Sequence, residues 1–337
     1  MLGEQLLIKM WETLIKEGIG SLASPWQIKR QGRAHAEVRK EELLLLAQAE
    51  VDAQAIREGK KRLTQDFKIV DSQHSENHFL IEYQDERKEP SLAIEHMSER
   101  HASAKAAAEL QEEINLNKTI ILAEQLITNS DSAPPQEEIG ADWLTRWRDS
   151  ARKVRSEELQ QLWAQALAGE LKSPGSYSLR TLDFLRNISK SEAEMISRLA
   201  PFVTKGVIYR DPLLDASGIN FSFLLEMEDI GVVSGIKGGG LEQTLKSISA
   251  EKFQSVIVSG SKVLIIEDPT TEKQLKMDCY KLSSIGAEVL SLGNFPKNIE
   301  HLKNIGTQIK LKGFSVKFAD WVQGADGGGH YFNAVEL

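Results

Sequence analysis

The chain opens with apolar residues that recur every three or four positions, and this spacing predicts an amphipathic helix over residues 1–19. Gly18 and Gly20 are expected to end it. Three uses of such a helix stay open: packing on its own domain, meeting a membrane, or contacting another subunit. The face that would serve any of these uses consists of Leu6, Leu7, Met10, Trp11, Leu14 and Ile15.

A run of basic residues follows this helix, with Glu37 as its only acid. Clustered cations behind an apolar-faced helix are typical of a segment that meets a lipid headgroup layer or a partner subunit. We therefore assign residues 1–40 to a membrane- or partner-contacting segment. Its cationic anchor would comprise Lys29, Arg30, Arg33, Arg39 and Lys40.

Long charged helices are predicted over residues 33–128. The first, to about residue 66, combines a seam of leucine and alanine with many acids, which is typical of helices that stack in bundles or coiled coils. A polar connection over 71–95 precedes a second helix over 98–127. Two prolines stand in a Ser/Asp-rich stretch at 129–135. Because proline cannot continue a helix, we place the main domain boundary there.

The next region, residues 139–203, is predicted to be a compact helical bundle in which Ser156 and Ser178 are N-caps. Beyond it the pattern changes to short apolar strands, with a β-hairpin over 255–266. Helix, hairpin and strand together predict a winged-helix-like module over 204–337. The predicted fold class is therefore mainly α, with N-terminal long helices, a central helical bundle and a C-terminal α+β winged-helix-like module.

Composition narrows the functional class. The chain has 337 residues and a formal net charge of −8, which argues against coating nucleic acid with its whole surface but leaves a local basic groove open. The single cysteine, Cys279, excludes an intrachain disulfide and fits a reducing compartment. The sequence holds no uninterrupted apolar run long enough for an ordinary spanning helix. The expected location is the bacterial cytoplasm, or the inner membrane if the first helix contacts lipid.

Signatures of catalysis are weak. His74 and His78 are four residues apart but lack the glutamate of a metalloprotease motif, so we interpret them as exposed polar residues and expect no metal and no cofactor. Three glycines, Gly238 to Gly240, precede a predicted helix from Leu241. A flexible turn is the preferred interpretation, with a phosphate cradle as the alternative. Since no nucleophile or acid/base pair stands out, we expect a protein that is not an enzyme.

Basic and aromatic residues are interleaved around Trp143, Trp147 and Trp163. Such interleaving can stack bases and hold phosphates, but tryptophans at helical spacing are more often core residues, and core is the preferred interpretation. If a nucleic-acid or nucleotide ligand binds, its candidate contacts are Arg146, Arg152, Lys153 and Arg155, with Lys237 secondary.

The block RSEELQQLWAQALAGELKSPGSYSLRTLDFLRNISKSEAEMISRLAPF, residues 155–202, resembles a bacterial family of unknown function that pairs an LWAxxLAGE-like helix with PGxxSxRTL. The stretch YKLSSIGAEVLSL, residues 280–292, is typical of the same proteins. The organisation of the chain is similar to the abortive-infection alpha group of phage-defence proteins and to the channel-type effector of the Hailong defence system. This resemblance implies a homo-oligomer, with four-fold symmetry, that inserts its N-terminal helices into the membrane and is gated by a nucleic-acid-like ligand. It carries over no catalytic residues.

The leading hypothesis is a non-enzymatic, oligomeric bacterial anti-phage defence effector that is directed to the membrane, forms a channel and is gated by a nucleic-acid or nucleotide ligand. Two alternatives stay open. One is a cytosolic nucleic-acid-binding regulator that uses the winged-helix-like module. The other is a scaffold subunit of a larger complex, whose activity belongs to a partner protein encoded nearby.

Overall fold

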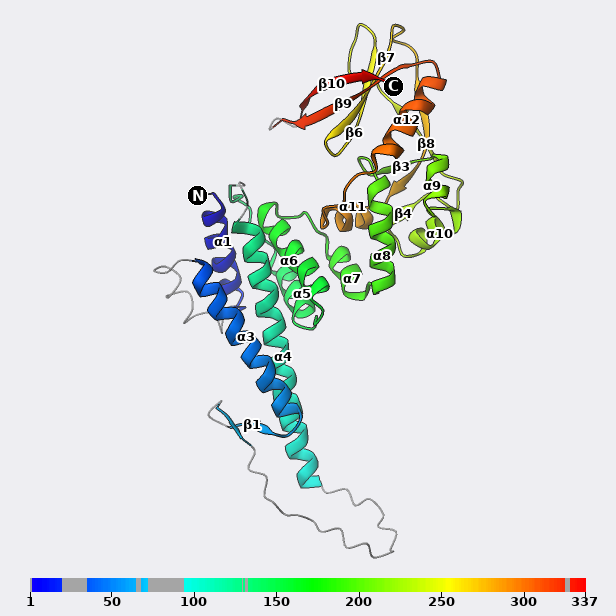
Figure 1. The fold of residues 1–337 in the computed structure, drawn as a ribbon. Coiled ribbons are helices and arrows are strands. Elements are labelled where there is room, and N and C mark those ends of the chain that lie inside the picture. Colours follow the sequence, from blue (N-terminus) through cyan, green and yellow to red (C-terminus); the bar gives the residue numbers. More distant parts are fainter. Residues whose placement is uncertain are drawn as a thin grey trace, which may run out of the picture. The chain divides into compact units, whose positions relative to one another are not determined.

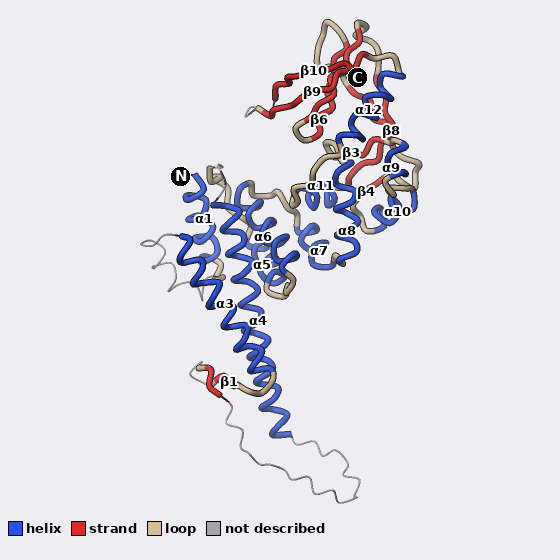
Figure 2. Tube along the Cα trace, viewed as in Figure 1, coloured by secondary structure: helices blue, strands red, loops and turns tan. Residues whose placement is uncertain are grey.

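The chain divides into two compact units, Met1–Tyr177 and Ser178–Leu337. The computed structural model describes residues 2–19, 35–64, 68–71, 94–128, 130, 133–324 and 328–337. The first unit is mostly helical, whereas the second combines helices with sheets (Figures 1 and 2). The predicted linker at 129–135 lies inside the first unit, and the predicted bundle at 139–203 spans the division between the two units.

The first unit is built from helices and a small hairpin. Its elements are α1 (Leu2–Lys16), α3 (His35–Arg57), β1 (Lys61–Leu63), β2 (Ile69–Asp71), α4 (Ile94–Thr128), α5 (Ala141–Ala151) and α6 (Glu157–Lys172). The helix predicted to run to about residue 66 ends at Arg57. Gly59 takes a positive φ of 75°, a conformation typical of the residue that ends a helix, and the chain then turns into the β1–β2 hairpin.

Helices α3 and α4 pack against each other along a buried apolar seam. The seam consists of Leu46, Ala53, Ile114 and Ile121. At its edge, Lys118 of α4 forms an ion pair of 2.6 Å with Glu50 of α3. The stacking of long helices that the leucine and alanine pattern predicts is therefore confirmed for this pair.

The tryptophans of α5 and α6 form the centre of the first unit. Trp147 and Trp163 are fully buried, and Trp143 is nearly so. The indole N–H of Trp147 donates to the carbonyl of Trp163 at 2.9 Å, and that of Trp143 donates to the carbonyl of Tyr177 at 2.8 Å. The preferred interpretation of these residues as core is confirmed, and buried rings of this kind cannot stack on a nucleic-acid base.

The second unit begins with short helices. Its helical elements are α7 (Leu179–Asn187), α8 (Lys190–Leu199), a 3-10 turn (Ala200–Phe202), α9 (Pro212–Ala216), α10 (Phe221–Asp229), α11 (Ser284–Ser291) and α12 (Ile299–Leu311). Ser178 caps α7 by accepting a hydrogen bond from the amide of Thr181, and Ser156 caps α6 in the same way. Both predicted N-caps are confirmed.

Two antiparallel sheets of four strands each complete the described part of the second unit. In the first sheet β8 (Leu275–Leu282) pairs with β3 (Val207–Tyr209), β4 (Val233–Ser234) and β5 (Leu241–Leu245). The second has the order β10–β9–β7–β6. Its strands are β6 (Phe253–Ser259), β7 (Lys262–Asp268), β9 (Ser315–Gln323) and β10 (Gly329–Glu336). Helix α12 packs on this sheet through Leu302, Ile305 and Ile309.

The predicted fold class is wrong. The structure is a mixed α+β fold with two four-stranded sheets, not a mainly α protein with a winged-helix-like end. Two misread segments account for much of the difference. The residues from Leu241, expected to start a helix, form β5, and the glycine-rich end of the chain, expected to be irregular, contains β10. The strand β5 depends on pairing with the distant residues of β8, and such pairing leaves little trace in the local pattern. The strand β10 pairs with β9, which directly precedes it in the chain.

Candidate functional site

The apolar face of α1 is largely covered by its own unit, where the helix packs on α4 and α6. The covered side chains are Leu6, Leu7, Met10 and Leu14. Trp11 is half-buried, and Ile15 is 42% exposed. Of the three uses that the sequence left open for this face, the structure shows packing on its own domain. Among the described helices, none combines the length and the apolar character that a membrane span requires.

A glycine fixes how closely α1 approaches α4. A Cβ atom on Gly3 would lie 2.8 Å from the carbonyl oxygen of Thr128 and 3.0 Å from that of Ser130. These are backbone atoms, so a larger residue would force the helix away from its position. Helix α1 is therefore fitted to this unit by its backbone as well as by its apolar side chains.

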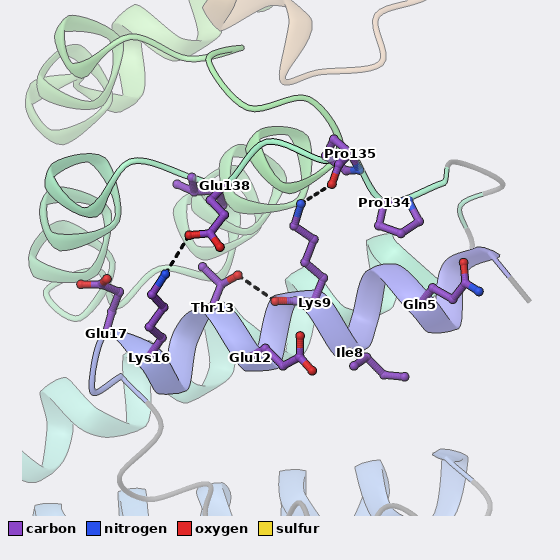
Figure 3. Close-up of a pocket in the computed structure, with 11 residues that line it drawn as sticks. Gln5, Ile8, Lys9, Glu12, Thr13, Lys16, Glu17, Pro134, Pro135 and Glu138 are labelled. Carbon is purple, nitrogen blue, oxygen red and sulfur yellow. Dashed lines mark hydrogen bonds and ion pairs between the residues drawn. The ribbon is translucent and has the colours of Figure 1, made fainter.

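Two lysines of α1 hold the extended segment that follows α4, and a surface groove lies between them and that segment (Figure 3). Lys9 donates to the carbonyls of Pro135 and Glu137, the latter at 2.6 Å, and Lys16 pairs with Glu138 at 2.8 Å. The hydrogen bond between Lys16 and Glu138 raises the pKa of the lysine and lowers the pKa of the carboxyl, so both stay charged near neutral pH. The groove thus provides paired charges, not an acid or base near its titration point.

The structure does not describe the side chains of the predicted cationic anchor. Lys29, Arg30 and Arg33 lie outside the described residues. Arg39 and Lys40 fall within α3, but their side chains are also outside the description. The anchor therefore stays a prediction.

The predicted ligand contacts lie within α5 and just after it, and they differ in exposure. Arg152 forms ion pairs with Glu112 at 2.8 Å and with Glu113 at 3.2 Å, which tie the end of α5 to α4. Arg146, Lys153 and Arg155 are exposed. Because Arg152 already serves the fold, the part of this cluster open to a phosphate is smaller than the sequence suggests.

The predicted phosphate cradle at Gly238 to Gly240 lacks the helix that it would need, because the chain continues into β5, and the amides of Gly239 and Gly240 donate to the carbonyls of Ile236 and Gly235 at 2.9 Å. The amides just before these glycines are also occupied. The amides of Gly235, Ile236 and Lys237 donate to the carboxylate of Glu228 at 2.7, 3.0 and 3.1 Å. Burial raises the pKa of Glu228, but these three donors together outweigh that effect and lower it. The Lys237 ammonium is paired with Asp229 at 2.6 Å. The chain's own carboxylate therefore occupies the position that an anion would take.

A buried histidine pair in the second unit has no counterpart in the sequence analysis. Nδ1 of His301, in α12, lies 3.1 Å from Oδ2 of Asp211, the N-cap of α9, and both side chains are almost fully buried. The Phe202 ring packs edge-on against the imidazole. Burial lowers the pKa of His301 more than Asp211 raises it. The histidine is therefore neutral at pH 7, and Nδ1 carries the proton because a carboxylate only accepts. This pair joins the start of α9 to α12.

The outward side of α3 carries the most exposed apolar residues of the first unit's described helices. Leu44 and Val51 are 62% and 61% exposed, whereas Leu46 is 7% exposed. Leu43 and Leu45 are also exposed. The four consecutive leucines therefore divide between one inward and three outward or lateral positions.

Metal and thiol chemistry have little basis in the described residues, among which no group of histidine, cysteine and carboxylate side chains is arranged to hold a metal ion. His74 and His78 lie outside them. Cys279 is buried in β8, and its pKa is raised by that burial, so its thiol is unreactive near neutral pH.

The motif that carries the family resemblance has a structural explanation. A Cβ on Gly169 would lie 2.6 Å from the ring of Tyr177, so the helix has room only for glycine at this position. The buried carboxylate of Glu170 accepts the amides of Gly175 and Tyr177 at 2.6 and 3.0 Å. Glycine and glutamate in LAGE thus hold the turn that contains PGSY. These residues therefore have a structural role in the fold.

The first unit is thus a packed group of helices with an exposed apolar side on α3. In both units, most of the polar side chains described above form contacts within their own unit. Residues 99–214, less than half of the chain, match a family described as a protein of unknown function (DUF2806). This range includes the block 155–202. No curated protein and no solved structure matches the chain.

Proposed function

We propose that this protein works by self-assembly and not by catalysis, as a homo-oligomeric effector or scaffold. The observation that carries the proposal is the exposed apolar side of α3, with Leu44 and Val51 more than half exposed. Contiguous exposed apolar surface on a folded protein favours a protein–protein contact. A long helix with a second apolar side is typical of helices that complete a bundle with another subunit.

The polar residues support the same proposal because they form contacts within their own units. Arg152, Lys237 and Glu228 are each held by partners within their own unit. The buried histidine pairs with a carboxylate and has no adjacent nucleophile among the residues described. A reaction needs a titratable group that reaches a substrate, and these residues are committed to the fold.

A role in anti-phage defence extends this proposal and rests on the resemblance to abortive-infection alpha proteins. In that role the exposed Arg146, Lys153 and Arg155 are the contacts for a nucleic-acid or nucleotide ligand. Replacing Lys153 and Arg155 together by glutamate is then expected to abolish protection against phage in a plaque assay while the protein still assembles. Unchanged protection would remove these residues from the proposal.

We propose that α1 contacts a membrane only in an activated state of the protein, not in the resting state. To expose Leu6, Leu7, Met10 and Leu14, α1 must leave its unit, which costs roughly 6–12 kcal/mol of buried apolar surface. The exposed side of α1 also carries Glu4 and Glu12, which anionic headgroups repel. We therefore expect the resting protein to remain unbound in a flotation assay with anionic vesicles. Flotation without any activating ligand would contradict this.

Sedimentation velocity over a wide concentration range tests the central claim. We expect a species with an integral multiple of the chain mass that dissociates on dilution. The measurement is made at low and high salt, because assembly through apolar surface persists at high salt whereas assembly through exposed charges weakens. A monomer at every concentration would overturn the proposal.

A further inference from the structure

Helix α3 has two apolar stripes on opposite sides. The inward stripe contains Leu46, Ala49 and Ala53, and it packs on α4. The outward stripe contains Leu44, Ala47 and Val51, which recur at three- and four-residue spacing and therefore share one side of the helix. Helix α4 covers the inward stripe, and the outward stripe is exposed and could pack against another helix.

The outward stripe is not interrupted by an unpaired charge. Among the side chains that the structure describes, the acids beside it are Glu50, Asp52 and Glu58, and each is paired within the chain: Glu50 with Lys118 at 2.6 Å, Asp52 with Lys61 at 2.7 Å and Glu58 with Lys60 at 2.7 Å. A second helix carrying the same acids would therefore meet little repulsion here. Ala47, at the middle of the stripe, is small enough for two helices to approach closely.

The stripe also complements itself. Leu44 and Val51 are seven residues apart, so a point between Ala47 and Gln48 lies midway between them. A two-fold axis at that point would set Leu44 of each copy opposite Val51 of the other, and the macrodipoles of the two helices would oppose favourably. Two-fold contacts of this kind use one patch twice and are the commonest in homo-oligomers.

We propose that α3 pairs antiparallel with α3 of a second copy of this chain, about a two-fold axis beside Ala47 and Gln48. This inference rests on the proposed self-assembly and names the contact through which it occurs. Four helices, α3 and α4 from each copy, then form one bundle in which both stripes of α3 are covered.

Disulfide cross-linking tests the direction and register of the pairing. The variant Leu44→Cys is mixed with the variant Val51→Cys under mild oxidation, and we expect a covalent dimer from the mixture. Neither variant alone should cross-link, because equal positions lie about 10 Å apart along antiparallel helices and a disulfide needs Cα atoms within about 7 Å. Ala47→Cys, beside the axis, should cross-link with itself. The wild-type chain, whose Cys279 is buried, is the control.

A charge substitution tests the energetic contribution of the stripe. We expect Val51→Glu to weaken self-association at least about a hundredfold, because two-fold symmetry places two carboxylates in each contact. The matched control is Leu311→Glu at the end of α12, where an equally apolar residue is 85% exposed, and it should leave association unchanged.

The remaining outcomes separate this contact from self-assembly in general. If the wild-type protein assembles but Val51→Glu has no effect and no cross-link forms, the α3 contact is wrong and the proposed function stands. Cross-linking of Leu44→Cys with itself would mean parallel pairing and overturn the antiparallel contact. If the wild-type protein is monomeric and Val51→Glu lowers its melting temperature, the chain itself covers this stripe, and both proposals fall.

Discussion

Helices α1 and α12 both pack on their units through a stripe of buried apolar side chains, but their polar contacts differ. Each buries apolar side chains at helical spacing, among them Leu6, Met10 and Leu14 in α1 and Leu302, Ile305 and Ile309 in α12. The polar contacts of α1 are the exposed lysines of the groove in Figure 3. The polar contacts of α12 include the buried bond between His301 and Asp211, besides an exposed contact of Lys310 with the carbonyl of Leu337.

This difference determines which conditions each attachment withstands. Lysine and glutamate titrate far from neutral pH, and their exposed pair contributes little once salt screens it. A buried histidine titrates close to neutral pH, and its charged form is expensive to bury. We therefore expect α1 to depend on packing alone and α12 to depend on packing and on pH.

The largest effect should come from placing a charge in either apolar contact. Met10→Asp and Ile305→Asp are each expected to cost about 4 kcal/mol or more, because both side chains are fully buried and a carboxylate there has no partner. Hydrogen exchange followed by mass spectrometry reports the two units separately. Met10→Asp should raise exchange in α1 and α4, and Ile305→Asp in α12 and β7.

The control for this prediction is Ile8→Asp, on the exposed side of α1, which should leave exchange nearly unchanged. If Met10→Asp were as well tolerated as Ile8→Asp, α1 would not be held in the first unit by its apolar face. The comparison with α12 would then fail, and the membrane-directed use of this face would gain support.

Helix α1 shows how much of the structure could be predicted from the sequence. Its spacing predicts the helix and an apolar face that also includes Trp11 and Ile15. The structure confirms the helix and the burial of Leu6, Leu7, Met10 and Leu14, but Trp11 is half-buried and Ile15 is exposed. What covers that face is decided by α4 and α6, which follow much later in the chain. An apolar stripe has the same pattern whether lipid, a subunit or its own domain covers it.

The hairpin predicted over 255–266 is confirmed as β6 and β7, but the strand β5 and the histidine pair were out of reach for a related reason. The strand β5 is short and weakly patterned, and β8 stabilises it through residues thirty or more positions away. His301 and Asp211 are 90 residues apart, and each by itself is an ordinary polar residue near a helix start. By contrast, Ser178 was predictable as a cap because its partner, the amide of Thr181, is local.

A smaller effect should distinguish the backbone contacts of the two helices. Gly3→Ala is expected to cost about 2 kcal/mol, because the new methyl group meets the carbonyls of Thr128 and Ser130 and backbone cannot move aside cheaply. Gly306→Ala, in α12, meets the side chains of Leu337 and Leu264, which can turn away, so its cost should be below about 1 kcal/mol. Chemical denaturation of both variants measures the difference. Equal costs would mean that α1 is not fitted more closely than α12.

The smallest effect concerns pH. The pKa of His301 is lowered from 6.5 in the folded protein, so the unfolded chain binds a proton that the folded chain does not. The stability that the neutral histidine provides is complete above about pH 6.5 and is lost as the pH falls below that value, by at most about 1.4 kcal/mol per pH unit. Exchange in α12 should therefore rise between pH 7.5 and 5.5, after correction for the intrinsic rate, while the protection of α1 stays constant.

His301→Gln separates titration from simple loss of packing. It is expected to change the stability of the second unit at every pH, but the dependence between pH 7.5 and 5.5 should disappear because glutamine does not titrate. Carboxylates with lowered pKa, such as Glu267 and Asp320, lose their ion pairs only at more acidic pH and do not interfere in this window. A pH dependence that survives in His301→Gln would assign the effect to another group and remove the distinction between the two helices.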